Sequence, residues 1–360
     1  MDMKKKKILY VVEAMGGGVF TYIVDLANKL VNEFDVYIAY AVRPQTPKNY
    51  REYFDERISL IEVKNFCREI NICKEIKAVR EIKKIAEKIK PDVIHLHSSK
   101  AGVIGRIAFN GKKIPLFYTP HGYSFLMANY KPVKRKIFKM IESIFAKRNC
   151  TTISCSLGEH RETLKFTQNA IYINNAVNVE KLKNSLEKVK IDDHQCTVFT
   201  LGRICYQKNP KLFNAVAETM PDVKFLWIGD GELRNQLKSS NIEVTGWIKR
   251  EEALKKSMNA DVFMLTSLWE GLPISLLEAM YMKKLCVVSN VIGNRDVIHN
   301  EDNGYVCDTV GDFVNAIKEQ KKEYIVKAYQ DLLENYETTV QAKKYAEVYN
   351  RVIDKWILAK

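Results

Sequence analysis

The chain has 360 residues, of which 46% are hydrophobic and 28% are charged. This is enough for two ordinary domains with separate cores and is typical of a soluble globular protein. No apolar run approaches the roughly 18 to 20 residues of a membrane span. The eight cysteines include no Cys-x-x-Cys pair, so zinc-binding and redox motifs lack support and a reducing compartment is expected.

Positive charge is concentrated in the first half. Residues 1–190 carry a net charge of +16 and residues 191–360 a net charge of −2. From Val93 to Ile141 there are nine Lys or Arg residues and no acid. We therefore expect this half to meet an anionic partner: lipid headgroups, phosphates or nucleic acid.

Short strand-like runs alternate with amphipathic helical runs through the first half. The apolar N-terminal run ILYVV is interrupted by Glu13, so it predicts a first β-strand rather than a signal peptide. The expected strands are residues 7–12, 35–42, 58–64, 92–98, 115–121, 150–156 and 170–175. The expected helices are residues 19–30, 73–90, 101–110, 131–148 and 156–166. This alternation predicts a parallel sheet that helices cover on both faces.

The alternation restarts in the second half. The expected strands are residues 196–201, 224–229, 242–247, 261–266, 285–290 and 304–308. The fold class is therefore α/β, with two doubly wound domains, in which ligands sit outside the carboxyl ends of the strands. The predicted boundaries are a first domain at 1–178, a linker at 179–195, a second domain at 196–335 and C-terminal helices at 336–360 that cross back to the first domain. Two such domains facing each other predict a cleft between them.

Two acids flank a turn in SLWEGLPISLLEAM, residues 267–280. Glu270 and Glu278 are separated by seven residues. Gly271 and Pro273 mark a turn, and Pro is favoured in the first turn of the helix that should follow. Glu278 would then lie on the apolar face of that helix, where an acid is costly without a partner. The alternative is one surface acid and one helix acid beside an accidental turn.

Cations follow the first strand of the second half in TLGRICYQKNP, residues 200–210. Asn209 is a good N-cap and Pro210 a good first helical residue. Arg203 and Lys208 would then lie near a helix N-terminus, where phosphate is favoured. The alternative is that both are solvated surface cations.

Glycines and a histidine follow strands of the first half. In EAMGGGVFTYIVDL, residues 13–26, Gly16 to Gly18 separate the first strand from the first helix, where the backbone can approach a phosphate or a sugar. The pattern is not Gly-x-Gly-x-x-Gly and no acid ends the second strand, which argues against a dinucleotide-dependent dehydrogenase. His121, in TPHGYSF, ends a strand and could contact a sugar or stabilise charge. A structural histidine is the alternative.

A metal site has little support in the sequence. His95 and His97 lie on one strand face and could join His121 around a metal, but no carboxylate flanks them. No Asp-x-Asp triplet occurs, although a sugar transferase that binds its donor diphosphate through a divalent metal would usually carry one. We therefore expect no metal and no other cofactor.

Taken together, these motifs resemble those of glycosyltransferase family 4, whose members are retaining enzymes with the two-domain GT-B fold. The most specific mark is the Glu270-x7-Glu278 pair with Gly-Leu-Pro between the acids. The glycine loop, the His-Gly step and the Gly-Arg with its downstream Lys occur in the expected order over nearly the whole chain. LHSSKAGVIGR and YTPHGYSF are similar in style to bacterial O-antigen and capsule assembly enzymes. The family's Asn-Gly-Val-Asp is Asn-Ala-Val-Asn here, at residues 175–178, and Trp269 precedes Glu270 where another aromatic is common; both leave the sugar open.

The resemblance implies roles for these residues. Glu270 would bind hydroxyls of the donor sugar, and Glu278 the ribose hydroxyls of the nucleotide. Arg203 and Lys208 would neutralise the leaving diphosphate in place of a metal, and His121 would lie beside the sugar. The other residues expected in the donor site are Gly271, Leu272, Pro273, Trp247, Gly16 and Gly17.

The resemblance also implies the reaction and its partners. The first domain would bind the acceptor and the second the nucleotide sugar. A hexose or N-acetylhexosamine would pass with retention from a UDP-sugar, less typically a GDP-sugar, to a polyprenyl-diphosphate-linked saccharide. Attack would occur on the same face that the diphosphate leaves, with the leaving phosphate as the base.

The run KPVKRKIFKMIESIFAKR, residues 131–148, predicts a basic amphipathic helix. Such a helix can lie on an anionic membrane, where a lipid-linked acceptor is found. A cytoplasmic protein bound peripherally to the inner face of the plasma membrane is therefore expected. The residues expected to face the membrane or acceptor are Lys134, Arg135, Lys136 and Lys139. The alternative is an ordinary domain helix with a charged outer face.

Two other functions fit parts of the pattern. A nucleic-acid-binding protein without enzymatic activity would use the positive charge, but it would leave the two spaced acids unexplained and lacks an aromatic-basic recognition motif. A nucleotide-sugar epimerase of the same fold would not need the basic surface of the first half. We therefore expect no nucleic acid partner.

Overall fold

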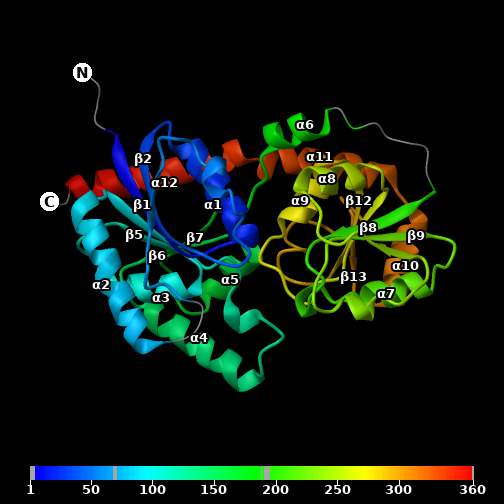
Figure 1. Ribbon diagram of the computed structural model, residues 1–360, viewed down its shortest axis with the longest axis horizontal. Helices are drawn as coiled ribbons and strands as arrows, with labels where there is room; N and C mark the ends of the chain where they lie inside the picture. The colour runs from blue at the N-terminus through cyan, green and yellow to red at the C-terminus, as the bar shows by residue number, and fades with distance from the viewer. Residues whose placement is uncertain (1–4, 68–70, 188, 190–194, 359–360) are drawn as a thin grey trace. The chain divides into compact units, whose positions relative to one another are not determined.

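The computed structural model describes residues 5–67, 71–187, 189 and 195–358. The chain divides into two compact units (Figure 1). The first unit comprises Met1–Phe125, Pro132–Asn175 and Thr338–Lys360, and the second comprises Leu126–Lys131 and Ala176–Glu337. The C-terminal segment of the chain therefore belongs to the first unit.

The described part of the first unit contains a seven-stranded parallel sheet in the order β3-β2-β1-β4-β5-β6-β7. Its strands are β1 (Lys6–Met15), β2 (Phe34–Val42), β3 (Ser59–Glu62), β4 (Val93–His97), β5 (Leu116–Thr119), β6 (Thr151–Ser154) and β7 (Ala170–Tyr172). Its helices are α1 (Gly17–Leu30), α2 (Ile72–Ile89), α3 (Ser99–Ala108), α4 (Pro132–Ala146), α5 (Leu157–Leu164) and α12 (Thr338–Leu358).

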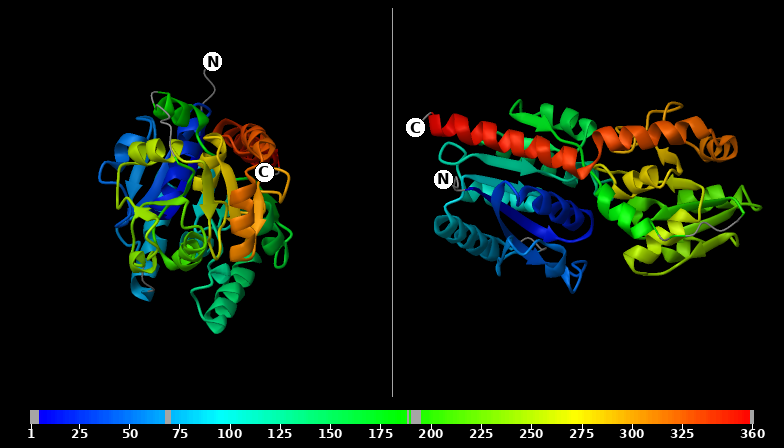
Figure 2. Two further views of the ribbon diagram at one scale, coloured as in Figure 1. Left: turned by 90° about the vertical axis from the view of Figure 1, so that its right-hand side faces the viewer. Right: turned by 90° about the horizontal axis from the view of Figure 1, so that it is seen from above.

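Strand alternation assigns the helices of the first unit to the two faces of its sheet. Tyr10 of β1 packs in one apolar core with α1 and with α12, the red helix of Figure 2. Other strand residues point to the opposite face, which α3 covers. There Leu96 of β4 lies against Gly105, and Tyr118 of β5 lies against Gly102. Successive side chains on a strand point to opposite faces, so β4 presents His95 to α12 and Leu96 to α3.

The described part of the second unit contains a six-stranded parallel sheet in the order β10-β9-β8-β11-β12-β13. Its strands are β8 (Thr197–Leu201), β9 (Lys224–Ile228), β10 (Ile242–Val244), β11 (Val262–Leu265), β12 (Leu285–Ser289) and β13 (Tyr305–Cys307). Its helices are α6 (Val179–Leu186), α7 (Pro210–Glu218), α8 (Arg250–Met258), α9 (Ile274–Tyr281), α10 (Val310–Glu319) and α11 (Lys322–Asn335).

The second sheet is also covered on both faces. Phe263 of β11 packs in one core with α8, α9 and α11, whereas Met264 beside it packs in another core with α7 and α10. Every strand expected from the sequence is present in the predicted order, and both sheets are parallel. The predicted α/β fold class with two doubly wound units is therefore confirmed.

Some boundaries differ from those expected. Residues 179–195 were assigned to a linker, but Val179–Leu186 form α6, and its Leu182 is buried in a core of the second unit. The apolar contact of Leu182 explains why a run that reads as polar is ordered against that unit. Residues 188 and 190–194 of the expected linker lie outside the described residues. No helix in the described ranges is both long and apolar enough to span a bilayer.

Candidate functional site

The candidate residues of the second unit lie where the strand order of its sheet reverses. From β8 the chain proceeds outward to β9 and β10, and then returns to β11 on the other side of β8. The loops that follow β8 and β11 therefore diverge from neighbouring strands at the carboxyl edge of the sheet. Such a reversal is where ligands bind in doubly wound sheets. Arg203 and Lys208 lie in the first loop and Glu270 in the second.

An ion pair joins these two loops. Lys208 Nζ donates to Glu270 Oε1 at 2.7 Å, and the two side chains are 16% and 8% exposed. Ser267 Oγ donates to the same oxygen at 2.7 Å, and Gln207 Nε2 donates to Oε2 at 3.3 Å. Gln207 Nε2 also donates to the Trp269 carbonyl at 2.9 Å. The Glu270 carboxylate is thus fixed by three side-chain donors, and a fixed carboxylate can accept further hydrogen bonds from sugar hydroxyls.

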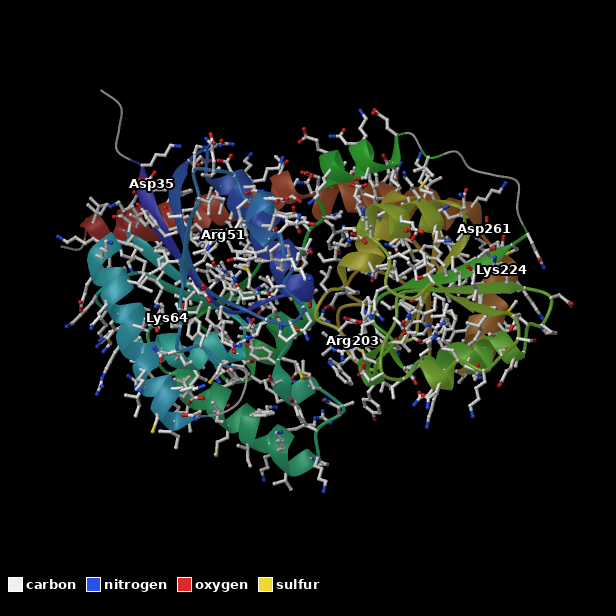
Figure 3. All side chains as sticks on the ribbon, in the orientation of Figure 1. Asp35, Arg51, Lys64, Arg203, Lys224 and Asp261 are labelled. Carbon is white, nitrogen blue, oxygen red and sulfur yellow. The ribbon has the colours of Figure 1, made fainter. Side chains whose placement is uncertain are left out.

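Arg203 does not share this cluster. Its guanidinium donates to Glu232 at 3.0 Å, and both side chains are half exposed. Figure 3 labels Arg203 on the second unit. The predicted proximity of Arg203 and Lys208 to a helix N-terminus holds along the chain, since α7 begins at Pro210. However, each of the two cations is paired with a different acid.

The predicted cap of α7 is wrong in its chemistry. Asn209 occupies the N-cap position, but its side chain makes no cap hydrogen bond. Its backbone has φ 51 and ψ 62, the left-handed conformation that Asn tolerates better than most residues. Asn209 therefore supplies a sharp turn before Pro210 instead of a side-chain cap.

Glu278 is buried on α9, as the apolar row predicts, and it has a partner that the sequence analysis missed. Arg250, the first residue of α8, donates its Nη2 to Glu278 Oε1. The Glu278 side chain is 1% exposed and that of Arg250 is 45% exposed. The cost of burying this carboxylate is therefore offset by a cation that reaches it from the surface. In the sequence, Arg250 shows only as part of the basic pair Lys249-Arg250 that follows the expected strand at 242–247.

The turn between the two acids is held by close backbone contacts. Gly293, with φ 88, lies so near Gly271 that an added Cβ would stand 2.4 Å from the Gly271 carbonyl oxygen. Leu272 is 4% exposed and packs in the core that contains α9, and Pro273 precedes the first residue of α9. The burial of Leu272 therefore holds the Gly-Leu-Pro segment against this core. Glu270 directly precedes the segment, and Glu278 lies on α9 after it.

Trp247 also lies beyond the carboxyl edge of the second sheet. It follows β10 and Gly246, which has φ 73, and the tryptophan is 70% exposed. An added Cβ on Gly246 would lie 3.7 Å from Asp230 Oδ2, which follows β9. An aromatic side chain with so much free surface can stack on a planar base.

The glycine loop of the first unit joins β1 to α1, beside the strand-order reversal between β1 and β4. Gly16 is the N-cap of α1, and Gly17 has φ 56, which favours glycine. An added Cβ on Gly16 would stand 3.2 Å from Gln45 Cβ, whereas one on Gly17 would meet nothing within 4 Å. The loop thus leaves open space at the start of α1, where backbone N–H groups favour an anion.

His121 follows β5, next to β4 at the same sheet edge, and its backbone φ is 56. His121 Nε2 and His97 Nδ1 are hydrogen-bonded at 3.1 Å, and the Tyr22 ring stands edge-on to His121 at 4.5 Å between centroids. Burial lowers the pKa of His121 to about 3. His121 is therefore neutral near pH 7, where it can form hydrogen bonds but does not carry the positive charge of an imidazolium.

The basic helix is α4, and its four predicted surface cations differ in their surroundings. Arg135 Nε donates to the Phe125 carbonyl at 2.8 Å, so this side chain is anchored to its own unit. Lys134, Lys136 and Lys139 are exposed, whereas Arg135 is half-buried. Apolar side chains share its outer surface: Val133, Ile137, Met140 and Ile144 are each between 46% and 73% exposed.

Among the described residues, no three His, Cys, Asp or Glu side chains form a group that could hold a metal ion. His95 and His97 are instead used within the protein. His95 bonds to Tyr349 Oη at 2.6 Å and Thr119 Oγ1 at 2.8 Å, and His97 bonds to His121.

Comparison with known proteins identifies two family models along the chain. The model described as Glycosyltransferase Family 4 matches residues 16–181, and the model described as Glycosyl transferases group 1 matches residues 181–348. An Escherichia coli UDP-Gal:α-D-GlcNAc-diphosphoundecaprenol α-1,3-galactosyltransferase is 32% identical over 74% of this chain and 76% of its own. A Campylobacter jejuni N,N'-diacetylbacillosaminyl-diphospho-undecaprenol α-1,3-N-acetylgalactosaminyltransferase is 24% identical over 75% and 79%.

Solved structures share the fold at lower identity. Sucrose-phosphate synthase from Thermosynechococcus elongatus superposes with a TM-score of 0.83 at 16% identity, covering 98% of this chain and 100% of that one. The HepE protein of Anabaena, solved with UDP and glucose, superposes with a TM-score of 0.75 at 15% identity, covering 96% and 99%.

Proposed function

Because the chain belongs to the family-4, group-1 glycosyltransferases, we propose that it transfers a hexose or N-acetylhexosamine from a UDP-sugar to a saccharide carried on a polyprenyl diphosphate. The observation that carries this proposal is the Lys208–Glu270 ion pair, which places a cation and a carboxylate together at the strand-order reversal of the second sheet. The relatives named above act on diphosphoundecaprenol-linked sugars. Galactose and N-acetylgalactosamine are therefore the first sugars to test.

In this proposal the second unit holds the sugar nucleotide. Glu270 accepts hydrogen bonds from hydroxyls of the sugar, with the Gly271–Pro273 backbone beside it. Glu278 accepts the ribose hydroxyls once Arg250 gives up its place, and Trp247 stacks on the uracil. The structure of the HepE protein with UDP and glucose, which has the same fold, supports the choice of UDP.

Charge develops on the diphosphate as the bond from the sugar C1 to its oxygen breaks. We assign Lys208 to this charge and Arg203 to the outer phosphate oxygens, so that fixed cations rather than a metal stabilise the transition state. His121, neutral at working pH, contacts the sugar, and the Gly16–Gly17 loop faces a phosphate or the acceptor. None of these roles requires a further cofactor.

We also propose retention of the sugar configuration. The acceptor hydroxyl bonds to C1 on the face from which the diphosphate departs, and its proton passes to the leaving phosphate oxygen. No side chain then forms a covalent bond to the sugar. The α linkage in the names of both lipid-linked relatives supports this course, because UDP-galactose itself carries its sugar in α linkage.

The lipid-linked acceptor requires the protein to work at a membrane, and α4 is the surface we assign to that contact. Val133, Ile137, Met140 and Ile144 recur at helical spacing and form one exposed stripe. The acid of this helix, Glu142, is buried against Arg106 at 2.9 Å and Tyr118, so it adds no negative charge to the stripe. Apolar side chains among lysines fit an anionic lipid surface, because the apolar groups can be buried between the lipids. Binding of nucleic acid depends mainly on phosphate contacts and would leave the apolar side chains exposed.

The experiment is a transfer assay with the full-length protein. UDP-galactose, UDP-N-acetylgalactosamine, UDP-glucose and UDP-N-acetylglucosamine are each offered with N-acetylglucosaminyl-diphospho-polyprenol, and products are detected by mass spectrometry. Glu270→Gln is expected to abolish transfer. Glu243→Gln serves as the matched control, because Glu243 is a surface acid on β10 that forms an ion pair with Lys224. Full activity of Glu270→Gln would contradict the assignment of this site.

A further inference from the structure

Three histidines lie side by side at the carboxyl edge of the first sheet, and only the half-buried His121 has so far been given a role. His95 and His97 of β4 are fully buried, and both face the side of the sheet that α12 covers. Both ring nitrogens of His95 are used, by Tyr349 Oη and by Thr119 Oγ1. His97 differs, because its Nδ1 bonds to His121 Nε2 while its Nε2 has no hydrogen-bond partner among the described residues.

The bond between His97 and His121 can be drawn in two ways. Burial lowers the pKa of both rings, so each is neutral and carries one proton. A neutral imidazole has one donor nitrogen and one acceptor nitrogen. Either His97 Nδ1–H donates to His121 Nε2, or His121 Nε2–H donates to His97 Nδ1.

The orphaned nitrogen of His97 decides between the two arrangements. If His121 donates, the proton of His97 must sit on Nε2, which leaves a fully buried N–H without an acceptor. If His97 donates, its Nε2 is unprotonated and carries a lone pair that accepts no hydrogen bond. A buried N–H with no acceptor is the rarer and costlier defect in folded proteins. The Tyr10 ring stands edge-on to His97 at 4.9 Å, but an N–H directed at an aromatic ring does not replace a hydrogen bond.

We propose that His97 is a positioning residue that fixes His121 in the Nδ1–H tautomer. His121 Nε2 is then occupied as an acceptor, and Nδ1–H is its free donor, since Nδ1 has no hydrogen-bond partner among the described residues and His121 is partly exposed. A donor of this kind recognises an oxygen with a lone pair, such as a sugar hydroxyl or a phosphate oxygen. It cannot act as a base toward the acceptor hydroxyl.

The surroundings of His121 hold its ring in the plane that this bond requires. Tyr22 packs edge-on against it, and the Tyr22 hydroxyl donates to Tyr345 on α12 at 2.5 Å. The following residue, Gly122, donates its N–H to Glu159 at 2.6 Å. The C-terminal helix α12 therefore contributes to the orientation of His121, which lies more than two hundred positions before Tyr345 in the chain.

The test is long-range ¹H–¹⁵N correlation spectroscopy on the full-length protein labelled with ¹⁵N-histidine, which distinguishes the two tautomers directly. The chain has six histidines, and the His121 signals are assigned by their loss in His121→Asn. We expect His121 to be Nδ1–H in the unmodified protein. In His97→Phe, which fills the space without a donor, it should shift to the Nε2–H form that histidine favours in water. In His97→Asn, whose amide can donate near the Nδ1 position, the Nδ1–H form should persist.

Tyr349→Phe is the matched control. It removes a hydroxyl bonded to His95 in the same buried cluster and leaves both atoms of the His97–His121 bond in place, so the His121 tautomer should not change. An Nε2–H tautomer of His121 in the unmodified protein would overturn the proposal. So would an Nδ1–H tautomer that survives in folded His97→Phe.

The kinetic consequence rests on the proposed function, whereas the tautomer does not. Because a histidine held in the wrong tautomer loses much of its catalytic effect, we expect His97→Phe to lower kcat at least about tenfold, with His97→Asn between it and the unmodified protein. The expected tautomer without any effect on turnover would refute the role of His121 in transfer and leave the assignment of His97 standing.

Discussion

Replacing Lys208 with Met tests the charge at the centre of the candidate site. Met keeps an unbranched chain of similar volume, so the change removes the ammonium group and little else. In the folded protein that group donates to Glu270 at 2.7 Å in a largely buried pair. Glu270 keeps Ser267 Oγ and Gln207 Nε2 as donors, so the loss to stability should not exceed about 1.5–3 kcal/mol, the range for a hydrogen bond to a charged group.

The effect on catalysis should be larger than the effect on stability. If Lys208 meets charge that develops only as the diphosphate leaves, its loss lowers kcat about 10²- to 10³-fold, equivalent to roughly 2.7–4 kcal/mol of transition-state stabilisation. KM for the sugar nucleotide should change much less. Initial rates of UDP release in the presence of acceptor measure both constants. Lys211→Met, at an exposed lysine of α7, is the control for loss of one positive charge. A kcat for Lys208→Met within threefold of the unmodified value would refute the assignment.

Three further predictions concern buried polar groups. Glu278→Gln should weaken UDP binding about tenfold in calorimetry, because a ribose-binding carboxylate accepts charge-assisted hydrogen bonds that an amide does not; unchanged affinity would show that Arg250 is its only partner of consequence. Arg106→Leu should lower the free energy of unfolding by about 3–5 kcal/mol in urea titrations, because it leaves the buried Glu142 carboxylate without its cation, and stability that stays within 1 kcal/mol would contradict this reading of the pair. Burial holds the pKa of both β4 histidines well below the ordinary 6.5, so the unfolded chain binds protons below that pH while the folded chain does not. The free energy of unfolding should therefore fall as pH drops below 6.5, by up to about 1.4 kcal/mol per pH unit for each histidine, and a His97→Phe protein whose slope matches the unmodified one would contradict this.

The sequence predicted the fold well because the signals that set it are local. Each strand is a short apolar run, and a parallel sheet buried on both faces needs nothing else from its strands. The two acids around Gly-Leu-Pro were also found locally, because one lies on an apolar helical row. That row correctly indicated that Glu278 is buried and requires a partner.

The partners themselves could not be predicted, since they depend on loops that meet only in the folded chain. Arg250 reaches Glu278 from another helix, 28 positions earlier, and nothing in its local sequence distinguishes it from a surface arginine. Arg203 was grouped with Lys208 by proximity in sequence, yet its guanidinium turns to Glu232 after β9. The bond between His97 and His121 arises because β4 and β5 are neighbours and His121 adopts a positive φ.

The measurement that tests the account most directly is the anomeric configuration of the product formed without metal. The EDTA-treated protein would be given the UDP-sugar that it uses, labelled with ¹³C at C1, together with the diphospho-polyprenol acceptor. NMR coupling between C1 and H1 then reports the configuration of the new linkage. The account predicts transfer in EDTA and an α product from an α-linked donor. A β product would contradict retention, and transfer that returns only on addition of Mg²⁺ would contradict the assignment of Lys208 and Arg203 to the charge of the leaving diphosphate.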